Sequence, residues 1–207
     1  MNTQNIILAN GSFPKSEAIL QLLDNAKQII CCDGAVNKLL KSGREPSIII
    51  GDLDSVADQI KEQYKNKLIH IKEQETNDLT KAINWCVSQN IKDIIIVGAT
   101  GEREDHTLAN IALLSVYKEL LNTEMVTDNG RFIPINKTTT FKASKGQQVS
   151  IFTQNPSLEV SSTGLKYPLQ NLKLNNWWMG TLNEVIDNKF TISFHEKESV
   201  IIYISKL

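Results

Sequence analysis

Residues 47–55 read Ser-Ile-Ile-Ile-Gly-Asp-Leu-Asp-Ser, a short isoleucine run that ends in a glycine and two aspartates. A short β-branched run bounded by turn residues predicts a buried strand. Similar runs lie on both sides of it and alternate with helical patterns. This alternation is typical of β–α units around a mostly parallel sheet.

The same pattern divides the chain into two parts. We expect strands over 5–9, 28–32, 47–50, 67–71, 93–97 and 124–127, with helices over 16–25, 35–42 and 107–121 and a further helix capped by Asn77. Asn129-Gly130 is typical of a tight turn, and only short β-rich runs follow it. We expect these runs to form strands over 131–135, 138–141, 148–153, 172–174, 190–194 and 200–205. The sequence therefore predicts a Rossmann-like α/β domain over 1–128 and a small all-β domain, an antiparallel sandwich or barrel, over 129–207.

Composition excludes several classes of protein. The chain has 207 residues, with 22 basic against 23 acidic side chains, so it lacks the basic excess that binding to nucleic acid requires. No apolar run approaches the ~20 residues needed to span a membrane. Three cysteines, two of them adjacent, make a poor disulfide framework. We expect a cytoplasmic protein with reduced thiols and with neither a nucleic-acid nor a membrane partner.

Acidic residues follow four of the predicted strands. Asp33 follows the second strand, Asp52 and Asp54 the third, Asp78 the fourth and Asp105 the fifth. Each single aspartate is explained by turn and cap chemistry. Four such loops at the edge where open parallel sheets bind ligands favour a cation, because crowded carboxylates repel one another.

Two of these loops predict more specific chemistry. In an extended strand end, Asp52 and Asp54 would point the same way with Leu53 packed inward, and oxygen ligands without His or Cys suit Mg²⁺. The loop over 98–106 combines two glycines with Arg103 just before a helix, a pattern that favours phosphate. Neither a P-loop nor a dinucleotide-binding motif is present.

The order of these motifs resembles the thiamine pyrophosphokinase family. The resemblance rests on Asp33-Gly34-Ala35-x-Asn37, Gly51-Asp52-Leu53-Asp54-Ser55, Thr76-Asn77-Asp78-Leu79-x-Lys81-Ala82, Gly101-x-Arg103-x-Asp105-His106-x-x-x-Asn110, 162–169 and Gly180-Thr181-Leu182-Asn183-Glu184. It covers essentially the whole chain. One departure is Leu182, which stands where the family usually has serine, so the resemblance implies the activity but no hydroxyl contact to substrate at this position.

The resemblance implies transfer of a pyrophosphoryl group from ATP to the hydroxyl of thiamine, giving thiamine diphosphate and AMP. It implies a homodimer whose active sites are shared between the α/β domain of one chain and the β domain of the other. Asp52, Asp54 and Asp78 would be the catalytic residues and would hold Mg²⁺. The implied ATP and phosphate contacts are Asp33, Asn37, Lys81, Arg103, Asp105, His106 and Asn110, and the implied thiamine contacts are Thr163, Tyr167 and Asn183.

Two other functions fit part of the sequence. The run over 48–55 is similar to the nucleophile motif of haloacid-dehalogenase-type phosphatases, in which Asp52 would form an aspartyl-phosphate. That family needs a later paired-aspartate motif, which is not found. A non-catalytic module that binds nucleotide or thiamine is the second alternative. Trp177-Trp178 fits either a ligand wall or an interface.

Overall fold

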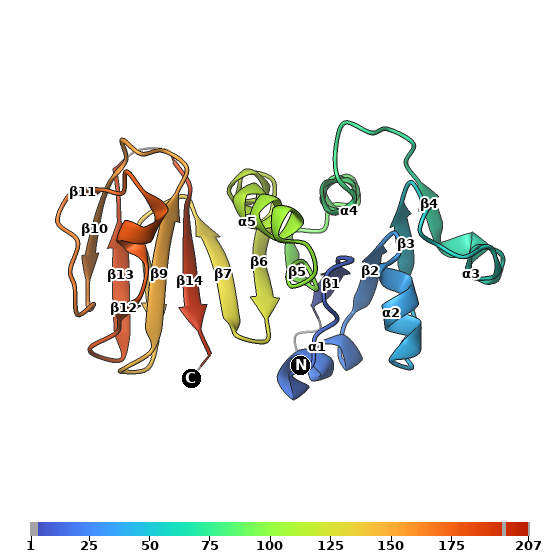
Figure 1. Ribbon diagram of the computed structural model, residues 1–207, viewed down its shortest axis with the longest axis horizontal. Helices are drawn as coiled ribbons and strands as arrows, with labels where there is room; N and C mark the ends of the chain where they lie inside the picture. Colours follow the sequence, from blue (N-terminus) through green and yellow to red (C-terminus); the bar gives the residue numbers. More distant parts are fainter. Residues whose placement is uncertain (1–3, 196–197, 207) are drawn as a thin grey trace. The chain divides into compact units, whose positions relative to one another are not determined.

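Figure 1 presents the computed structural model, which describes residues 4–195 and 198–206. By compactness the chain divides into two units, and each has its own hydrophobic core. The first unit comprises Met1–Ile111 and Leu120–Asp128, and the second comprises Ala112–Glu119 and Asn129–Leu207.

The first unit contains a six-stranded parallel sheet. Its strands are β1 (Asn5–Leu8), β2 (Gln28–Cys32), β3 (Ile48–Gly51), β4 (Leu68–His70), β5 (Asp93–Val97) and β6 (Asn122–Thr127). They lie in the order β4-β3-β2-β1-β5-β6, and every neighbouring pair is parallel. The order reverses direction between β1 and β5, which makes this the topological switch point of the sheet.

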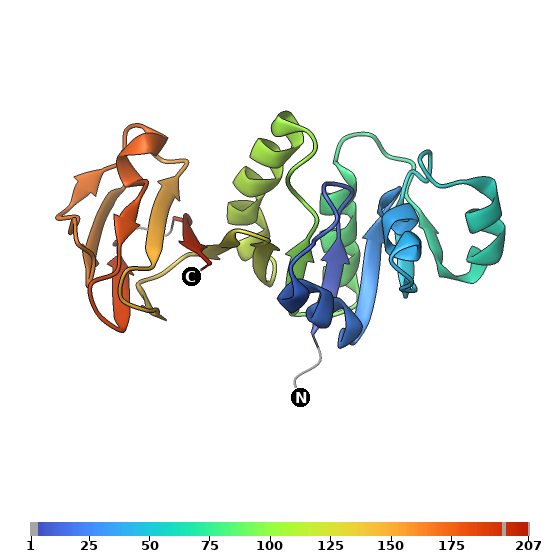
Figure 2. The same ribbon diagram turned by 60° about the horizontal axis from the view of Figure 1, so that its bottom comes forward.

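Helices cover both faces of this sheet. They are α1 (Glu17–Asp24), α2 (Ala35–Lys41), α3 (Asp58–Gln63), α4 (Asp78–Ser88) and the first part of α5 (Glu104–Lys118), with a 3₁₀ turn, η1, at Lys65–Lys67. From Ala112 on, α5 belongs to the second unit. Side chains alternate along each strand, so Ile6 and Leu8 pack with α1 and α2 while Ile7 is buried on the opposite face. Helix α4 contacts β2 and β3 on that opposite face (Figure 2).

The three cysteines belong to this unit and are unpaired. Cys31 and Cys32 end β2, and Cys86 lies on α4; all three are buried. Burial raises the pKa of each thiol, that of Cys86 to about 12, because a thiolate would lose its hydration. The thiols are therefore protonated and unreactive in the folded chain.

The second unit is a sandwich of two antiparallel sheets. Its strands are β7 (Gly130–Ile135), β8 (Thr139–Lys142), β9 (Gln148–Thr153), β10 (Glu159–Thr163), β11 (Leu172–Lys173), β12 (Asn183–Glu184), β13 (Lys189–Ser193) and β14 (Val200–Ser205), with a 3₁₀ turn, η2, at Trp177–Gly180. One sheet has the order β12-β9-β14-β7 and the other β11-β10-β13-β8. Both contribute to one core, in which Phe141 and Phe190 stack with ring centroids 4.9 Å apart.

This architecture confirms the predicted fold class, an α/β unit with a mostly parallel sheet followed by a β-rich one. The structure departs from the sequence prediction in several elements: α5 begins at Glu104 rather than residue 107, and α3, β10 and β12 were not predicted. Within the described residues, no helix combines the length and apolar composition that crossing a bilayer requires.

Candidate active site

A cavity of about 320 Å³ lies at the carboxyl edge of the parallel sheet, at its switch point. The residues that follow β1, β2 and β5 line it, together with the first turns of α4 and α5. Open α/β sheets bind their ligands at this place. The predicted site residues among its lining are Asp33, Asp78, Arg103, His106 and Asn110.

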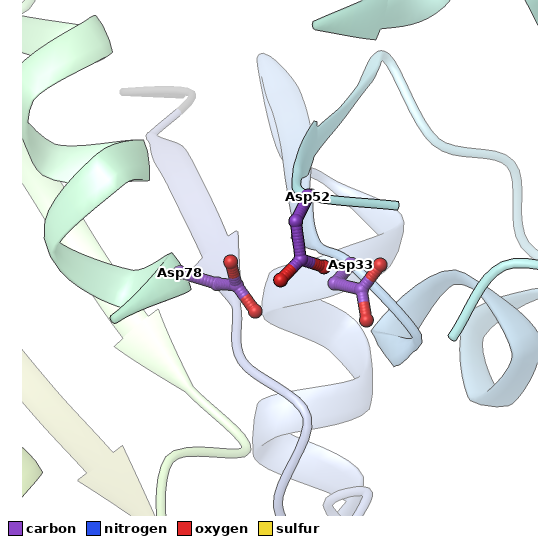
Figure 3. Close-up of side chains that lie close together, drawn as sticks. All are labelled: Asp33, Asp52 and Asp78. Carbon is purple, nitrogen blue, oxygen red and sulfur yellow. The ribbon is translucent and has the colours of Figure 1, made fainter. Parts of the chain in front are cut away.

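Three aspartates meet beside this cavity. Asp33 follows β2, Asp52 follows β3, and Asp78 is the first residue of α4, which Asn77 caps by accepting a hydrogen bond from the backbone N–H of Thr80. One carboxylate oxygen from each of the three lies within 4.8 Å of the others. Figure 3 shows the Asp78 side chain reaching from α4 toward Asp52, with Asp33 close by. Three segments far apart in sequence thus present oxygens to one point.

The donor set of this cluster fits a divalent cation. The Asp33 side chain is buried, and its Oδ1 has no hydrogen-bond partner, while its Oδ2 accepts from the backbone N–H of Ser55 at 3.3 Å. A buried carboxylate oxygen without a partner loses its hydration and gains nothing in return. Hard oxygen ligands with no nitrogen or sulfur among them suit a cation such as Mg²⁺.

A buried lysine faces the cluster from α4. The Lys81 side chain is only 2% exposed, and its Nζ lies 3.2 Å from Oδ1 of Asp78. Burial raises the pKa of Asp78, and the Lys81 ammonium opposes that rise. The pKa of Asp52 is lowered, chiefly by hydrogen bonds from the backbone N–H of Asp54 and the side-chain amide of Gln74, with a smaller pull from Lys81. Lys81 is therefore placed against the aspartates rather than on the cavity wall.

Asp54 lies outside the cluster. The prediction that Asp52 and Asp54 share a face assumed an extended strand end, and that assumption is wrong, because β3 ends at Gly51 and Leu53 has φ +64°. Leu53 is buried as predicted, but Asp54 is exposed to solvent. Asp33 takes the third place in the cluster. A metal-binding role for Asp54 stays a prediction.

Arg103 and Asp105 form an exposed pair at the start of α5. Nε and Nη2 of Arg103 donate to the two carboxylate oxygens of Asp105, at 3.1 and 2.6 Å. The guanidinium, together with the backbone N–H of His106, holds the pKa of Asp105 well below its usual range. The fork that could bind phosphate is thus occupied by a neighbouring carboxylate, and an arriving anion would compete for it. His106 is exposed beside this pair.

Two predicted contacts, Asn37 and Asn110, hold the loops together. Nδ2 of Asn37 donates to the carbonyl oxygen of Ser55 at 3.0 Å. Asn110 is buried, donates to the carbonyl of Ala99 and accepts from the side chain of Asn77 at 3.2 Å. Through Asn110, the loop after β5 is connected to the cap of α4. Both side chains therefore stiffen the cavity wall.

The loop after β1 was not among the predicted site residues. Asn10 and Gly11 line the cavity, and the Gly11 N–H donates to the carbonyl of Gly98 at 2.6 Å. Nζ of Lys38 on α2 donates to the carbonyls of Asn10 and Gly11 and to Glu102 at 2.6 Å. All three donors of that ammonium are satisfied. The sequence could have indicated this loop, because the predicted strand over 5–9 ends at the same edge of the sheet as the strands that precede the aspartates.

The predicted thiamine contacts lie in the second unit. Tyr167 is 61% exposed, which excludes a core role, and Thr163 is exposed at the end of β10. Asn183 is buried, accepts from the backbone N–H of Tyr167 at 3.1 Å and donates to its carbonyl at 2.6 Å. The Asn183 amide is thus engaged in holding the Tyr167 backbone. Leu182 and Trp178 are exposed nearby in sequence, at 69% and 73%.

Two family models match the chain. The one described as "Thiamin pyrophosphokinase, catalytic domain" matches residues 19–125, and the one described as "Thiamin pyrophosphokinase, substrate-binding domain" matches residues 130–203. Together they span both units of the structure.

Individual proteins match as well. The chain is 30% identical to thiamin pyrophosphokinase 1 of Caenorhabditis elegans over 79% of this chain and 74% of that protein. It is 28% identical to thiamine pyrophosphokinase of Bacillus subtilis over 94% of each. The solved thiamin pyrophosphokinase from Candida albicans has a TM-score of 0.81 at 18% identity, covering 98% of this chain and 89% of that one. At that identity, the structural likeness shows the fold alone.

Proposed function

Because the chain belongs to the thiamin pyrophosphokinase family and is a thiamine diphosphokinase, we propose that the cavity at the switch point of its parallel sheet is where ATP gives up its pyrophosphoryl group. The acceptor is the hydroxyl of thiamine, and the products are thiamine diphosphate and AMP. The observation that carries this location is the meeting of Asp33, Asp52 and Asp78, with an unpartnered oxygen on Asp33.

Mg²⁺ is the cation we propose for this cluster. Asp33, Asp52 and Asp78 would hold it, and the exposed Asp54 remains a candidate for an additional ligand. When bound, Mg²⁺ would neutralise the triphosphate and orient it for displacement. The three aspartates, of which Asp33 is buried, would fix the position of that charge.

The remaining cavity residues would bind and orient the nucleotide. Arg103 would exchange its bond to Asp105 for phosphate oxygens, and His106 would contact the same region. The thiamine hydroxyl must attack the β-phosphorus in line with the departing AMP oxygen. Asn110 and Asn37 hold the loops that set this alignment. Positioning of this kind supplies most of the rate in phosphoryl transfer.

We also propose that thiamine is bound by the second unit and that the enzyme is a homodimer with shared sites. The exposed ring of Tyr167 supports this, because an aromatic face attracts a cationic heterocycle. The Asn183 hydrogen bonds to the Tyr167 backbone would set the position of that ring. Thr163 would offer a hydroxyl beside it.

One assay separates this function from the alternatives. Purified protein, ATP and Mg²⁺ are incubated with and without thiamine, and AMP and inorganic phosphate are measured. We expect AMP to form only when thiamine is present, in a 1:1 ratio with thiamine diphosphate. A phosphatase would release inorganic phosphate and form an aspartyl-phosphate, and a binding module would release neither. Either result would contradict the proposal.

A further inference from the structure

Lys81 is a buried basic residue that contacts the aspartate cluster through Asp78. Its Nζ lies 3.2 Å from Oδ1 of Asp78, and only 2% of the side chain is exposed. It is absent from the lining of the cavity. Its charge therefore acts on the cluster through Asp78, the carboxylate that it contacts.

The cluster needs such a charge whenever it holds no metal ion. Carboxylate oxygens from Asp33, Asp52 and Asp78 lie within 4.8 Å of one another, and like charges at this separation repel, most of all at Asp33, whose side chain is buried. A buried ammonium is equally unfavourable without a counter-charge. The Lys81 ammonium and the cluster therefore compensate each other's charge, with one cation for three carboxylates.

We propose that Lys81 is the resident counter-cation of the aspartate cluster, a positioning residue that keeps Asp33, Asp52 and Asp78 assembled while the metal site is empty. The inference rests on the metal site in the proposed function, but not on the identity of either substrate. If it is right, removal of the Lys81 charge makes the folded state depend on a divalent cation. A bound cation then supplies the compensation that the lysine supplied, and stabilises the fold by mass action.

The test measures thermal unfolding of the whole chain, without ATP or thiamine, in EDTA and in MgCl₂ at matched ionic strength. The variants are Lys81→Met, which removes the charge, and Lys81→Arg, which keeps it. Ile83→Ala is the control, because Ile83 is a fully buried apolar residue of the same helix. We expect Mg²⁺ to raise the Tm of Lys81→Met at least twice as much as that of the wild type. Lys81→Arg and Ile83→Ala should keep a wild-type-sized rise, although Ile83→Ala lowers Tm in both buffers.

A wild-type-sized rise in Lys81→Met would overturn the inference and would assign Lys81 to packing alone. If Lys81→Met does not fold in EDTA, the double variant Lys81→Met/Asp78→Asn decides, because loss of one carboxylate should restore folding. Failure of that rescue would overturn the inference as well. The activity and this inference are tested by different measurements. The AMP assay tests the activity. If Mg²⁺ leaves the Tm unchanged in every variant and in the wild type, the proposed metal site and this inference are both wrong, whatever the AMP assay shows.

Discussion

One residue of the aspartate cluster, Asp33, and one next to Asp52 in sequence, Leu53, have backbone conformations that residues other than glycine rarely adopt. Asp33 has φ +42° and Leu53 has φ +64°. Such a conformation is unfavourable by roughly 1–2 kcal/mol per residue, so packing must hold it. Leu53 is buried, and the Asp33 N–H donates to the carbonyl of Ile50 at 2.8 Å. The fold thus holds the backbone at these two positions in a conformation that is unfavourable by itself.

Asp33 and Asp52 should each be essential for turnover. We expect Asp33→Asn and Asp52→Asn to lower kcat by on the order of 10²-fold or more, because each removes a charged ligand where positioned charge does most of the work. Steady-state AMP formation at saturating Mg²⁺ measures this. Asp58→Asn is the matched control, since that carboxylate is fully exposed on α3. Near-wild-type turnover in either cluster variant would contradict the assignment.

The sequence predicted which loops form the site better than which side chains meet in it. Strands that end at one edge bring their following loops together, so the loops carrying Asp33, Asp52 and Asp78 could be named in advance. The replacement of Asp54 by Asp33 in the cluster depends on the left-handed turn at Leu53. Leucine gives no local signal for that conformation. Only the packing of the whole unit selects it.

At the scale of elements, the loops after β1 and β5 are joined backbone to backbone. A Cβ on Gly11 would lie 2.5 Å from the carbonyl oxygen of Gly98 and 2.6 Å from that of Thr100. We expect Gly11→Ala to force these loops apart and to raise the KM for ATP about tenfold, since misplacement by about 1 Å is costly in a positioned site. Steady-state kinetics over a range of ATP concentrations measures the change.

Gly146→Ala is the control for this substitution. Gly146 has φ +86° but open space around it, so alanine there should cost about 1–2 kcal/mol of stability and leave the ATP KM unchanged. An equal change in KM for both variants would show that the effect comes from lost stability rather than from the loop contact.

Two side-chain hydrogen bonds tie the end of helix α3 and the turn that follows it to the segment before β3, one from Tyr64 and one from Lys67 to the carbonyl of Pro46. The Tyr64 hydroxyl donates to Oε2 of Glu45 at 2.6 Å. This bond raises the pKa of Tyr64 from its ordinary value of 10 to about 12. A raised pKa in the folded state gives stability that is complete below pH 10 and is lost as the pH rises from 10 to 12. Tyr64→Phe should remove this pH-dependent contribution to the free energy of unfolding.

Urea unfolding at pH 8 and pH 11.5 tests this expectation. At pH 8, Tyr64→Phe should be less stable than the wild type by about 1.5–3 kcal/mol, the usual worth of a hydrogen bond to a charged group. At pH 11.5 the difference should shrink. The comparison between the two proteins cancels the titration of lysines, which both share. A difference that does not change with pH would contradict the assigned bond.

Local pattern explains which elements were predicted. Short apolar, β-branched runs predicted β2, β5, β9 and β14 at their observed bounds. Helix α3 was not predicted because its six residues contain a single apolar side chain, Ile60. The first turn of α5 contains Glu104 and Asp105, both exposed, so it lacks the apolar period that marks the rest of the helix. Short or solvent-facing turns leave no hydrophobic signal.

At the scale of the whole molecule, the proposal that two chains share their active sites makes a quantitative prediction. One chain carrying Asp52→Asn and another carrying Tyr167→Ala should complement each other after subunit exchange. About half of the dimers would be mixed, and each would have one intact site, so roughly a quarter of wild-type activity should return. Activity that stays at the level of the separate variants after verified exchange would show that both halves act within one chain.

The three buried cysteines allow transient opening of the first unit to be measured by thiol labelling. Thiolates attack alkylating reagents, whereas Cys31, Cys32 and Cys86 are protonated and buried while the unit is closed. Each can be labelled only during a transient opening, so its labelling rate gives the free energy of that opening, as hydrogen exchange does for amides. Cys32 lines the cavity, whereas Cys31 lies in the core formed with α1 and α2. The labelling rates of these cysteines therefore measure the opening of the first unit at the cavity and in the core separately, with no probe engineered into the chain.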